Sequence, residues 1–314
     1  MSPLAPPRIK PGDTIGIVAP AGPIKSRDAL QRGLDRLAST FTLVVGDTVT
    51  AARDAELPSY LSASDAERAD ELNGMLANPD IRAIVCARGG YGLTRILDSL
   101  DPTPLVRDPK PIVGFSDATA LLAWAYAAGV RGIHGPVVVQ LGNLPILETE
   151  RLIRLLTDPA PLGRLPWSIE TADDGCYVGH LIPANLTLAS MLVGTRWPLP
   201  LDGAIALFEE VGEKPYEIDR YLTQLEATRA LYGVEAVLWG ELVRCVDPNP
   251  PTGEPDPADA AQRVIVERLA SFATPCAFGA PIGHGDRNTA IPFGAACELD
   301  LDERILTIVD GAVA

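Results

Sequence analysis

Ser116 follows an apolar run, in the segment Val113-Gly114-Phe115-Ser116-Asp117. The pattern predicts a strand over 111–115 that turns directly into a helix over 117–128. Such a turn can expose a serine hydroxyl and place the backbone N–H of Asp117 at the helix N-terminus, where developing negative charge is stabilised. This is the logic of a nucleophile elbow, although Ala118 stands where the usual G-x-S-x-G motif has its second glycine. Taken alone, the segment is more typical of a serine that only caps the helix.

A glycine-rich segment, Arg88-Gly89-Gly90-Tyr91-Gly92, also follows a predicted strand, over 81–86. Glycines at such a point allow backbone N–H groups to turn toward a ligand, as an oxyanion hole requires. A tight turn without a ligand is the alternative. The segment lacks the G-K-[ST] ending of a P-loop, and the segment 19–23 after the first predicted strand does not fit the dinucleotide-binding fingerprint.

A serine nucleophile needs a base, and the chain contains three histidines, His134, His180 and His284. His284 lies in the glycine-flanked turn Gly283-His284-Gly285, and a loop histidine can both take up a proton and give it back. His134 ends a predicted strand and also fits a structural role. His180 precedes an apolar run, which makes it the weakest candidate.

A histidine base needs a carboxylate that orients it, and Glu209 and Glu210 end a predicted strand over 204–208. Adjacent carboxylates at a buried strand end are costly unless they have partners. A solvated run of charges is the alternative. The three histidines show no H-x-x-x-H or H-E-x-x-H spacing, so we expect no metal site and no cofactor.

The first half of the chain alternates predicted strands with predicted helices, and these elements must position the candidate residues. Strands are predicted over 14–20, 41–45, 81–86, 111–115 and 132–134, with helices over 26–38, 64–76, 92–99 and 117–128. The alternation is typical of an α/β domain with a mainly parallel sheet, for which we expect a flavodoxin-like arrangement. Ligands of such a sheet lie outside the carboxyl ends of its strands.

The character of the chain changes after residue 142. A short helix over 148–157 is followed by three prolines and by an acidic stretch that ends in Asp173-Asp174-Gly175. We therefore predict a nucleophile-bearing α/β domain over 1–142 and a linker over 143–175. A smaller C-terminal α/β domain over 176–314 would carry the glutamate and the histidine.

The composition excludes several classes of function. The net charge of −15 argues against nucleic acid as a partner and against a membrane surface, because both would require clusters of Lys and Arg. No apolar stretch approaches the roughly 20 residues of a transmembrane helix, and the N-terminus lacks the features of a signal peptide, so we expect a cytoplasmic protein. The five cysteines form no C-x-x-C pair, and we expect them to be reduced.

Taken together, these segments resemble the LD-carboxypeptidase family of serine peptidases, which includes muramoyltetrapeptide carboxypeptidases and microcin C self-immunity proteins. The resemblance runs almost from end to end, and the order and spacing of the segments make it specific. It is carried by residues 12–21, 88–92, 114–117, 134–136, 185–186, 194–195, 209–213, 216–220 and 283–285.

The resemblance implies a Ser-Glu-His triad formed by Ser116, Glu209 and His284. It also implies that the backbone N–H groups of Gly90 and Asp117 form the oxyanion hole, and it leaves His134 with a structural role.

Two segments depart from the family pattern. The family usually has Leu-Glu-Asp where this chain has Phe208-Glu209-Glu210, and Glu209 aligns with the family's glutamate. The family also favours Gly-Gly-Asn-Leu where this chain has Pro183-Ala184-Asn185-Leu186, a change that could alter the substrate range.

The resemblance further implies a substrate and an assembly. The substrate would be murein tetrapeptide, cleaved between an L-centre and the terminal D-Ala during peptidoglycan recycling, and the protein would be a homodimer. The carboxylate of D-Ala requires a cation, and Arg88, next to Gly89, is the nearest candidate in the sequence.

Two alternatives stay open. A microcin-immunity-type amidase would cleave aminoacyl-nucleotide conjugates and would need an aromatic platform, which Trp167 could supply. A non-catalytic muropeptide-binding protein of the same fold would not need the hydroxyl of Ser116.

Overall fold

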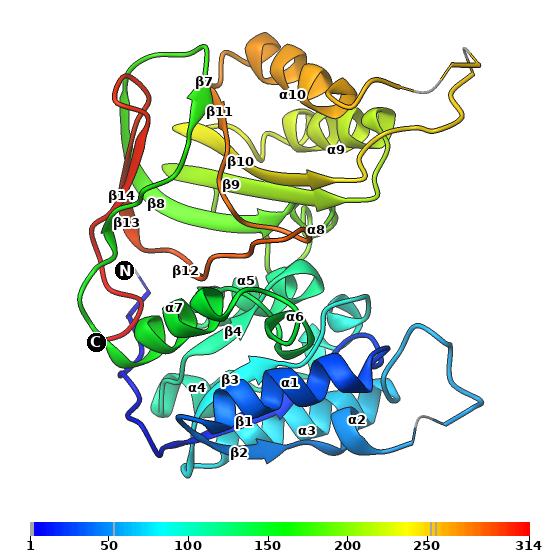
Figure 1. Ribbon diagram of the computed structural model, residues 1–314, viewed down its shortest axis with the longest axis vertical. Helices are drawn as coiled ribbons and strands as arrows, with labels where there is room; N and C mark the ends of the chain where they lie inside the picture. Colours follow the sequence, from blue (N-terminus) through cyan, green and yellow to red (C-terminus); the bar gives the residue numbers. More distant parts are fainter. Residues whose placement is uncertain (1–2, 53, 252, 255) are drawn as a thin grey trace. The chain divides into compact units, whose positions relative to one another are not determined.

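A computed structural model describes residues 3–314 with the exception of residues 53, 252 and 255. The chain forms two compact units, each with its own sheet (Figure 1). Unit 1 contains the chain up to Ala160 together with Thr289–Gly294 and Gly311–Ala314, and unit 2 contains Pro161–Asn288 and Ala295–Asp310. Both units combine helices with strands, so the predicted α/β class is confirmed.

The sheet of unit 1 is parallel except at one edge. Its strands are β1 (Thr14–Val18), β2 (Thr42–Val45), β3 (Ile81–Cys86), β4 (Ile112–Gly114), β5 (Ile133–His134) and β12 (Ile291–Pro292). They lie in the order β12-β5-β4-β3-β1-β2, and only β12 runs antiparallel to its neighbour. The parallel strands follow the flavodoxin-like order, so the loops after β1 and β3 flank the point where such folds bind ligands.

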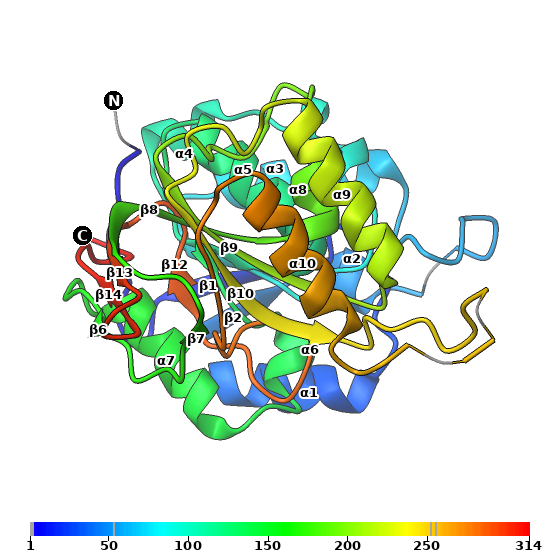
Figure 2. The same cartoon turned by 90° about the horizontal axis from the view of Figure 1, so that it is seen from above.

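Helices cover both faces of this sheet. They are α1 (Arg27–Ala38), α2 (Asp47–Thr50), α3 (Asp65–Ala77), α4 (Thr103–Arg107), α5 (Thr119–Ala127), α6 (Val138–Leu141) and α7 (Ile146–Thr157). Figure 2 shows α1, α6 and α7 on one side of the strands, with α3, α4 and α5 on the other. The helix α3 begins with the capping box that the sequence pattern predicts, in which Ser64 and Glu67 bond each other's backbone N–H groups.

The sheet of unit 2 is mixed. Its strands are β6 (Gly163–Arg164), β7 (Glu170–Thr171), β8 (Cys176–Asn185), β9 (Ala204–Val211), β10 (Ala236–Val243), β11 (Cys276–Phe278), β13 (Ala296–Asp300) and β14 (Ile305–Ile308). The order is β6-β14-β13-β8-β9-β10-β11-β7, with β8 to β11 parallel and the other pairs antiparallel.

Three helices accompany this second sheet: α8 (Leu186–Met191), α9 (Pro215–Ala227) and α10 (Ala260–Ser271). The helix α9 contacts both α8 and α10. The helix α8 follows β8 without a loop, because Asn185 ends the strand and caps the helix by accepting the N–H of Leu188.

The units differ from the sequence segments 1–142, 143–175 and 176–314. The segment predicted as a linker contains α7, which belongs to unit 1, and two short edge strands, which belong to unit 2. The chain also returns to unit 1 at residues 289–294, where β12 pairs with β5.

The helix predicted over 92–99 is also different in the structure. It is replaced by two 3-10 turns, η1 (Leu93–Arg95) and η2 (Leu97–Ser99), which follow Gly92 at a φ of 136°. Separately, none of the helices in the described parts of the chain has both the length and the hydropathy needed to cross a bilayer.

Candidate active site

Ser116 lies in a strained turn at the carboxyl end of β4. Phe115 is extended, Ser116 has a φ of +61°, and the chain then enters the 3-10 turn η3 (Ser116–Ala118) and the buried helix α5. A non-glycine residue in this left-handed region costs about 1–3 kcal/mol, and such strain concentrates at functional sites. A Cβ on Gly114 would lie 2.6 Å from the Cβ of Ala118, so the tight turn requires glycine there. The geometry is that of a nucleophile elbow.

The glycine turn after β3 lies directly against this serine. A Cβ on Gly89 would lie 2.9 Å from the Cβ of Ser116 and 3.1 Å from its Oγ, so only glycine allows this approach. The N–H of Gly22, in the loop after β1, donates to the carbonyl of Gly89 at 3.0 Å. Gly90 has a φ of +111°, a conformation that glycine adopts readily. Three chain segments therefore meet at the carboxyl edge of the sheet of unit 1.

The carboxylate of Asp117 links the turn after β4 to the glycine segment after β3. Its Oδ2 accepts the N–H of Leu93 at 2.9 Å, and the N–H of Gly92 also donates to its carboxylate. The buried Arg68 donates to the carbonyl oxygens of Gly92, at 2.9 Å, and of Pro20. Burial raises the pKa of Asp117 to about 6, although the two N–H groups and the charge of Arg68 act in the opposite direction.

His284 and Glu209 form a hydrogen-bonded pair at the carboxyl edge of the parallel strands of unit 2. Nδ1 of His284 lies 2.7 Å from Oε2 of Glu209. Glu209 lies near the end of β9 and is fully buried. The second carboxylate oxygen accepts Nδ2 of Asn185 at 3.2 Å. With Nδ1 as the donor to this carboxylate, Nε2 of a neutral ring is the acceptor, as a general base requires.

The protonation of His284 is set by opposing effects. Burial lowers its pKa, but the hydrogen bond and charge of Glu209 and the charge of Glu210 outweigh burial and raise the pKa above its ordinary value. The charge of Arg244 acts with burial. The side chain of His284 is 21% exposed, so the ring is sheltered but accessible.

Glu210 has a different role from its neighbour. Its Oε2 accepts the N–H and the hydroxyl of Thr187, each at 2.8 Å, and its Oε1 accepts Asn185 Nδ2 at 3.0 Å and the N–H of Val211 at 2.8 Å. These contacts anchor the start of α8 to β9. The carboxylate that contacts the histidine is therefore that of Glu209, and neither glutamate belongs to a solvated run of charges.

The other two histidines lie elsewhere. His134 is fully buried in β5, where its ring makes an edge contact with Phe115 at 5.9 Å between centroids. His180 lies in β8, and its Nε2 is 2.8 Å from the carbonyl oxygen of Pro200.

The predicted substrate contacts have mixed positions. Arg88 is half-buried beside the glycine turn, where it donates to the carbonyl of Pro23 and where burial lowers its pKa. Trp167 lines a surface hollow together with Glu303, Arg304 and Ile305, at the turn between β13 and β14. That turn adjoins Cys176 at the start of β8, whereas Asn185 is its tenth and last residue, about 30 Å away at ~3.3 Å per residue. The structure does not bring Trp167 to His284.

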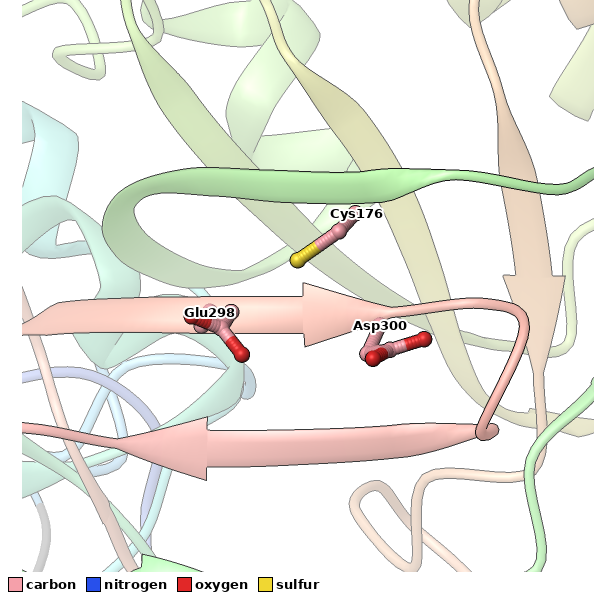
Figure 3. A group of neighbouring side chains, drawn as sticks. All are labelled: Cys176, Glu298 and Asp300. Atoms are coloured by element: carbon pink, nitrogen blue, oxygen red, sulfur yellow. The ribbon is translucent and has the colours of Figure 1, made fainter.

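One group among the described residues could in principle hold a metal ion: Cys176 on β8 with Glu298 and Asp300 on β13 (Figure 3). Their ligand atoms all lie within 4.8 Å of one another. Cys176 and Glu298 are exposed, and exposed acidic groups are common without an ion, so the cluster by itself gives no support for a metal site.

Comparisons with known proteins show the family of the chain. Residues 15–135 match the LD-carboxypeptidase N-terminal domain, and residues 178–299 match the LD-carboxypeptidase C-terminal domain. A putative carboxypeptidase of Synechocystis is 32% identical over 98% of this chain and 97% of its own. The murein tetrapeptide carboxypeptidase of Pseudomonas aeruginosa is 31% identical over 77% of this chain and 80% of its own.

The microcin C7 self-immunity protein MccF of Escherichia coli is 27% identical over 95% of this chain and 94% of its own. A structure of MccF in complex with aspartyl sulfamoyl adenosine matches this fold with a TM-score of 0.86 and 26% identity, over 99% of this chain and 100% of that one. The chain belongs to the LD-carboxypeptidase family, and with it to the peptidases.

Proposed function

We propose that the protein is a serine LD-carboxypeptidase of the muramoyltetrapeptide type, which removes the terminal D-Ala of murein tetrapeptide. Ser116 is the nucleophile, His284 the base and Glu209 the residue that orients the base. The observation that carries the proposal is the 2.7 Å hydrogen bond between His284 Nδ1 and the buried Glu209. A neutral ring that donates from Nδ1 has Nε2 as its acceptor, which is what removal of the proton from a serine hydroxyl requires.

The reaction would proceed through an acyl-enzyme. Nε2 of His284 takes the proton of Ser116 as its Oγ attacks the carbonyl carbon of the L-configured residue. The N–H groups of Gly90 and Asp117 stabilise the oxyanion, and Nε2 then returns the proton to the amine of the leaving D-Ala. Water, activated by the same nitrogen, hydrolyses the ester. The attack requires Ser116 Oγ to come within about 2.6–3.2 Å of Nε2.

The substrate assignment is supported by relatives that are named for murein peptides, among them the Pseudomonas enzyme. A leaving group with a carboxylate needs a cation, and Arg88 beside Gly89 stays the candidate in this chain. We propose further that the enzyme acts as a homodimer in cytoplasmic peptidoglycan recycling. Light scattering of the purified protein tests the dimer.

Release of D-Ala tests the activity directly. We expect purified protein to release D-Ala from murein tetrapeptide and from L-Lys-D-Ala, and we expect Ser116→Ala to release none. A fluorophosphonate probe should label the wild type at Ser116 and fail to label His284→Ala. A wild-type protein that binds muropeptide without releasing D-Ala would instead support the non-catalytic alternative.

A second candidate is an amidase that cleaves aminoacyl-nucleotide conjugates. It is favoured by the similarity to MccF, whose solved complex contains aspartyl sulfamoyl adenosine. The position of Trp167 at the amino end of β8 gives it no support, because an aromatic platform must lie near the reacting centre. Incubation with such a conjugate separates the two: D-Ala release without cleavage of the conjugate would eliminate the amidase.

A further inference from the structure

The strand β10 carries one extra residue beside the His284–Glu209 pair. Trp239 pairs with Phe208 and Leu242 pairs with Glu210, so Gly240 and Glu241 together lie opposite Glu209. A bulge of this kind bends a strand locally and redirects a side chain, and bulges are frequent next to active sites. A Cβ on Gly240 would lie 2.4 Å from the carbonyl oxygen of Ile282, so this strand runs directly against the histidine loop.

The redirected side chain is that of Glu241, and it holds the loop 282–287. The N–H of Gly285, next to the histidine, donates to Glu241 Oε2 at 2.7 Å, and the N–H of Arg287 also donates to this carboxylate. The backbone N–H of Glu241 donates to the carbonyl of Ile282 at 2.8 Å. One residue of β10 therefore bonds the loop on both sides of His284.

The glycines that flank His284 make this contact possible. A Cβ on Gly285 would lie 2.5 Å from Glu241 Oε2. A Cβ on Gly283, which has a φ of +145°, would lie 3.0 Å from the Cβ of Glu241 and 3.4 Å from Oε2 of Glu209. Gly283 thus fits between the two glutamates, and any side chain there would push the loop away from one of them.

We propose that Glu241 is a positioning residue, which fixes the loop 282–287 so that His284 Nδ1 stays against Glu209. The proposal rests on the proposed function of His284 as the base. Glu241 acts through the backbone of the loop and does not touch the reacting atoms. Misplacement of a catalytic group by about 1 Å can cost up to ~10²-fold in rate, so the anchor has a measurable effect.

The charged groups around His284 and Glu209 allow the effect of the backbone contacts of Glu241 to be distinguished from the effect of its charge. Glu209, Glu210 and Arg244 act on the pKa of His284. Burial raises the pKa of Glu241, and the charges of Asp286 and Glu209 raise it further. Asp286 is an exposed carboxylate on the same loop, so its removal changes the local charge and leaves the backbone contacts of Glu241 in place.

The test compares Glu241→Ala and Glu241→Gln with the control Asp286→Asn. The pKa of each histidine is followed by NMR, which is practical because the chain has three histidines, and His134 and His180 report whether each unit is intact. We expect Glu241→Ala to lower the pKa of His284 toward its value in Glu209→Gln, and to reduce kcat about 10–10²-fold with little change in KM. Glu241→Gln keeps one acceptor oxygen and should lie between Glu241→Ala and the wild type.

The outcomes separate this proposal from the peptidase function. If Glu241→Ala leaves both the pKa of His284 and kcat unchanged, or if Asp286→Asn has the same effect, Glu241 is not the anchor. If the wild type releases no D-Ala while Glu241→Ala still shifts the His284 titration, the positioning role stands and the peptidase function fails. A lowered His284 pKa, with unchanged His134 and His180 signals, supports the proposal.

Discussion

We call the surroundings of Ser116 in unit 1 the backbone half-site and the surroundings of His284 in unit 2 the carboxylate half-site. The two differ in the groups that form them. Around Ser116 in unit 1, the geometry is made by the backbone: a φ of +61° at the serine, glycines at 89 and 90, and N–H groups at the ends of strands. Around His284 in unit 2, it is made by carboxylates, since Glu209, Glu210 and Glu241 each bond a specific donor. The first half-site should therefore respond to added atoms, and the second to removed charge.

The difference matches what each group must do. A nucleophile and an oxyanion hole need atoms at fixed positions. A strained backbone fixes these positions, and backbone groups do not titrate. A base needs a pKa near the working pH, and nearby carboxylates are the groups that adjust it. The comparison leads to four predictions: three on activity, ordered from the largest effect to the smallest, and one on stability.

Removal of the Ser116 hydroxyl or of the His284 ring should cause the same loss of activity, although the two residues lie in different half-sites. We expect Ser116→Ala and His284→Ala each to reduce kcat by about 10⁶-fold, and the double variant to be no worse, because triad members act as a unit. D-Ala release measured for the three variants checks this. Losses that add in the double variant would show that the two residues act independently.

Removal of the Glu209 carboxylate should change the pH dependence of kcat/KM. Since the pKa of His284 is raised, its ring gains a proton as the pH falls through that value, and kcat/KM should fall with it. Glu209→Gln removes the bond and charge that raise the pKa, so we expect the acid limb of the kcat/KM profile to move to lower pH. The plateau should fall about 10³–10⁴-fold, because the ring loses its orientation. A lower plateau with an unmoved limb would contradict this account.

A methyl group should damage the backbone half-site. Gly89→Ala places a Cβ 2.9 Å from the Cβ of Ser116, and we expect kcat to fall about 10²-fold without a change in the pH profile. The matched control is Gly74→Ala in α3, where a Cβ meets nothing within 4 Å. That variant should keep full activity and gain about 0.5–1 kcal/mol in the free energy of unfolding. Equal losses in both variants would count against the predicted role of Gly89.

The last prediction concerns stability in unit 1 and not activity. The pKa of Asp117 is about 6 in the folded protein and 3.8 ordinarily, so between these values the folded state binds more protons than the unfolded state. The stabilising contribution is complete below pH 3.8 and is lost as the pH rises to about 6, a change of about 3 kcal/mol. Urea unfolding from pH 4 to 7 should show a steeper decline in the wild type than in Asp117→Asn, in which the other groups with raised pKa values, among them Glu241 and His284, still titrate. Parallel curves for the two proteins would exclude the assignment.

Much of the backbone half-site could be predicted from the sequence. An apolar run that ends in Gly-Phe-Ser-Asp and leads into Thr119–Ala127 marks a strand, a turn and a buried helix, and the alternation of elements indicates the parallel sheet. The left-handed conformation of Ser116 could not be predicted, because serine has no local preference for it; the packing of α5 and of Gly89 enforces it.

The carboxylate half-site was less accessible to sequence analysis. Glu209 and His284 are 75 positions apart, so no local pattern links them. They could be proposed only from their residue types and from the family resemblance. Asn185 was known only as part of a motif, although a polar residue between an apolar strand and a helix is a signal that could have been used. Glu241 was missed, because its position depends on the extra residue in β10, and a bulge leaves no mark in a pattern of hydrophobicity.

The strand β12 also constrains how the polypeptide can be made and divided. A fragment that ends at Ala160 would lack this strand, so it would expose the edge of β5, a site for pairing with other chains. During synthesis, the sheet of unit 1 is completed only after the segment with β8 to β11 has left the ribosome. We therefore expect the first unit to mature late, and we expect isolated N-terminal fragments to aggregate rather than accumulate as folded domains.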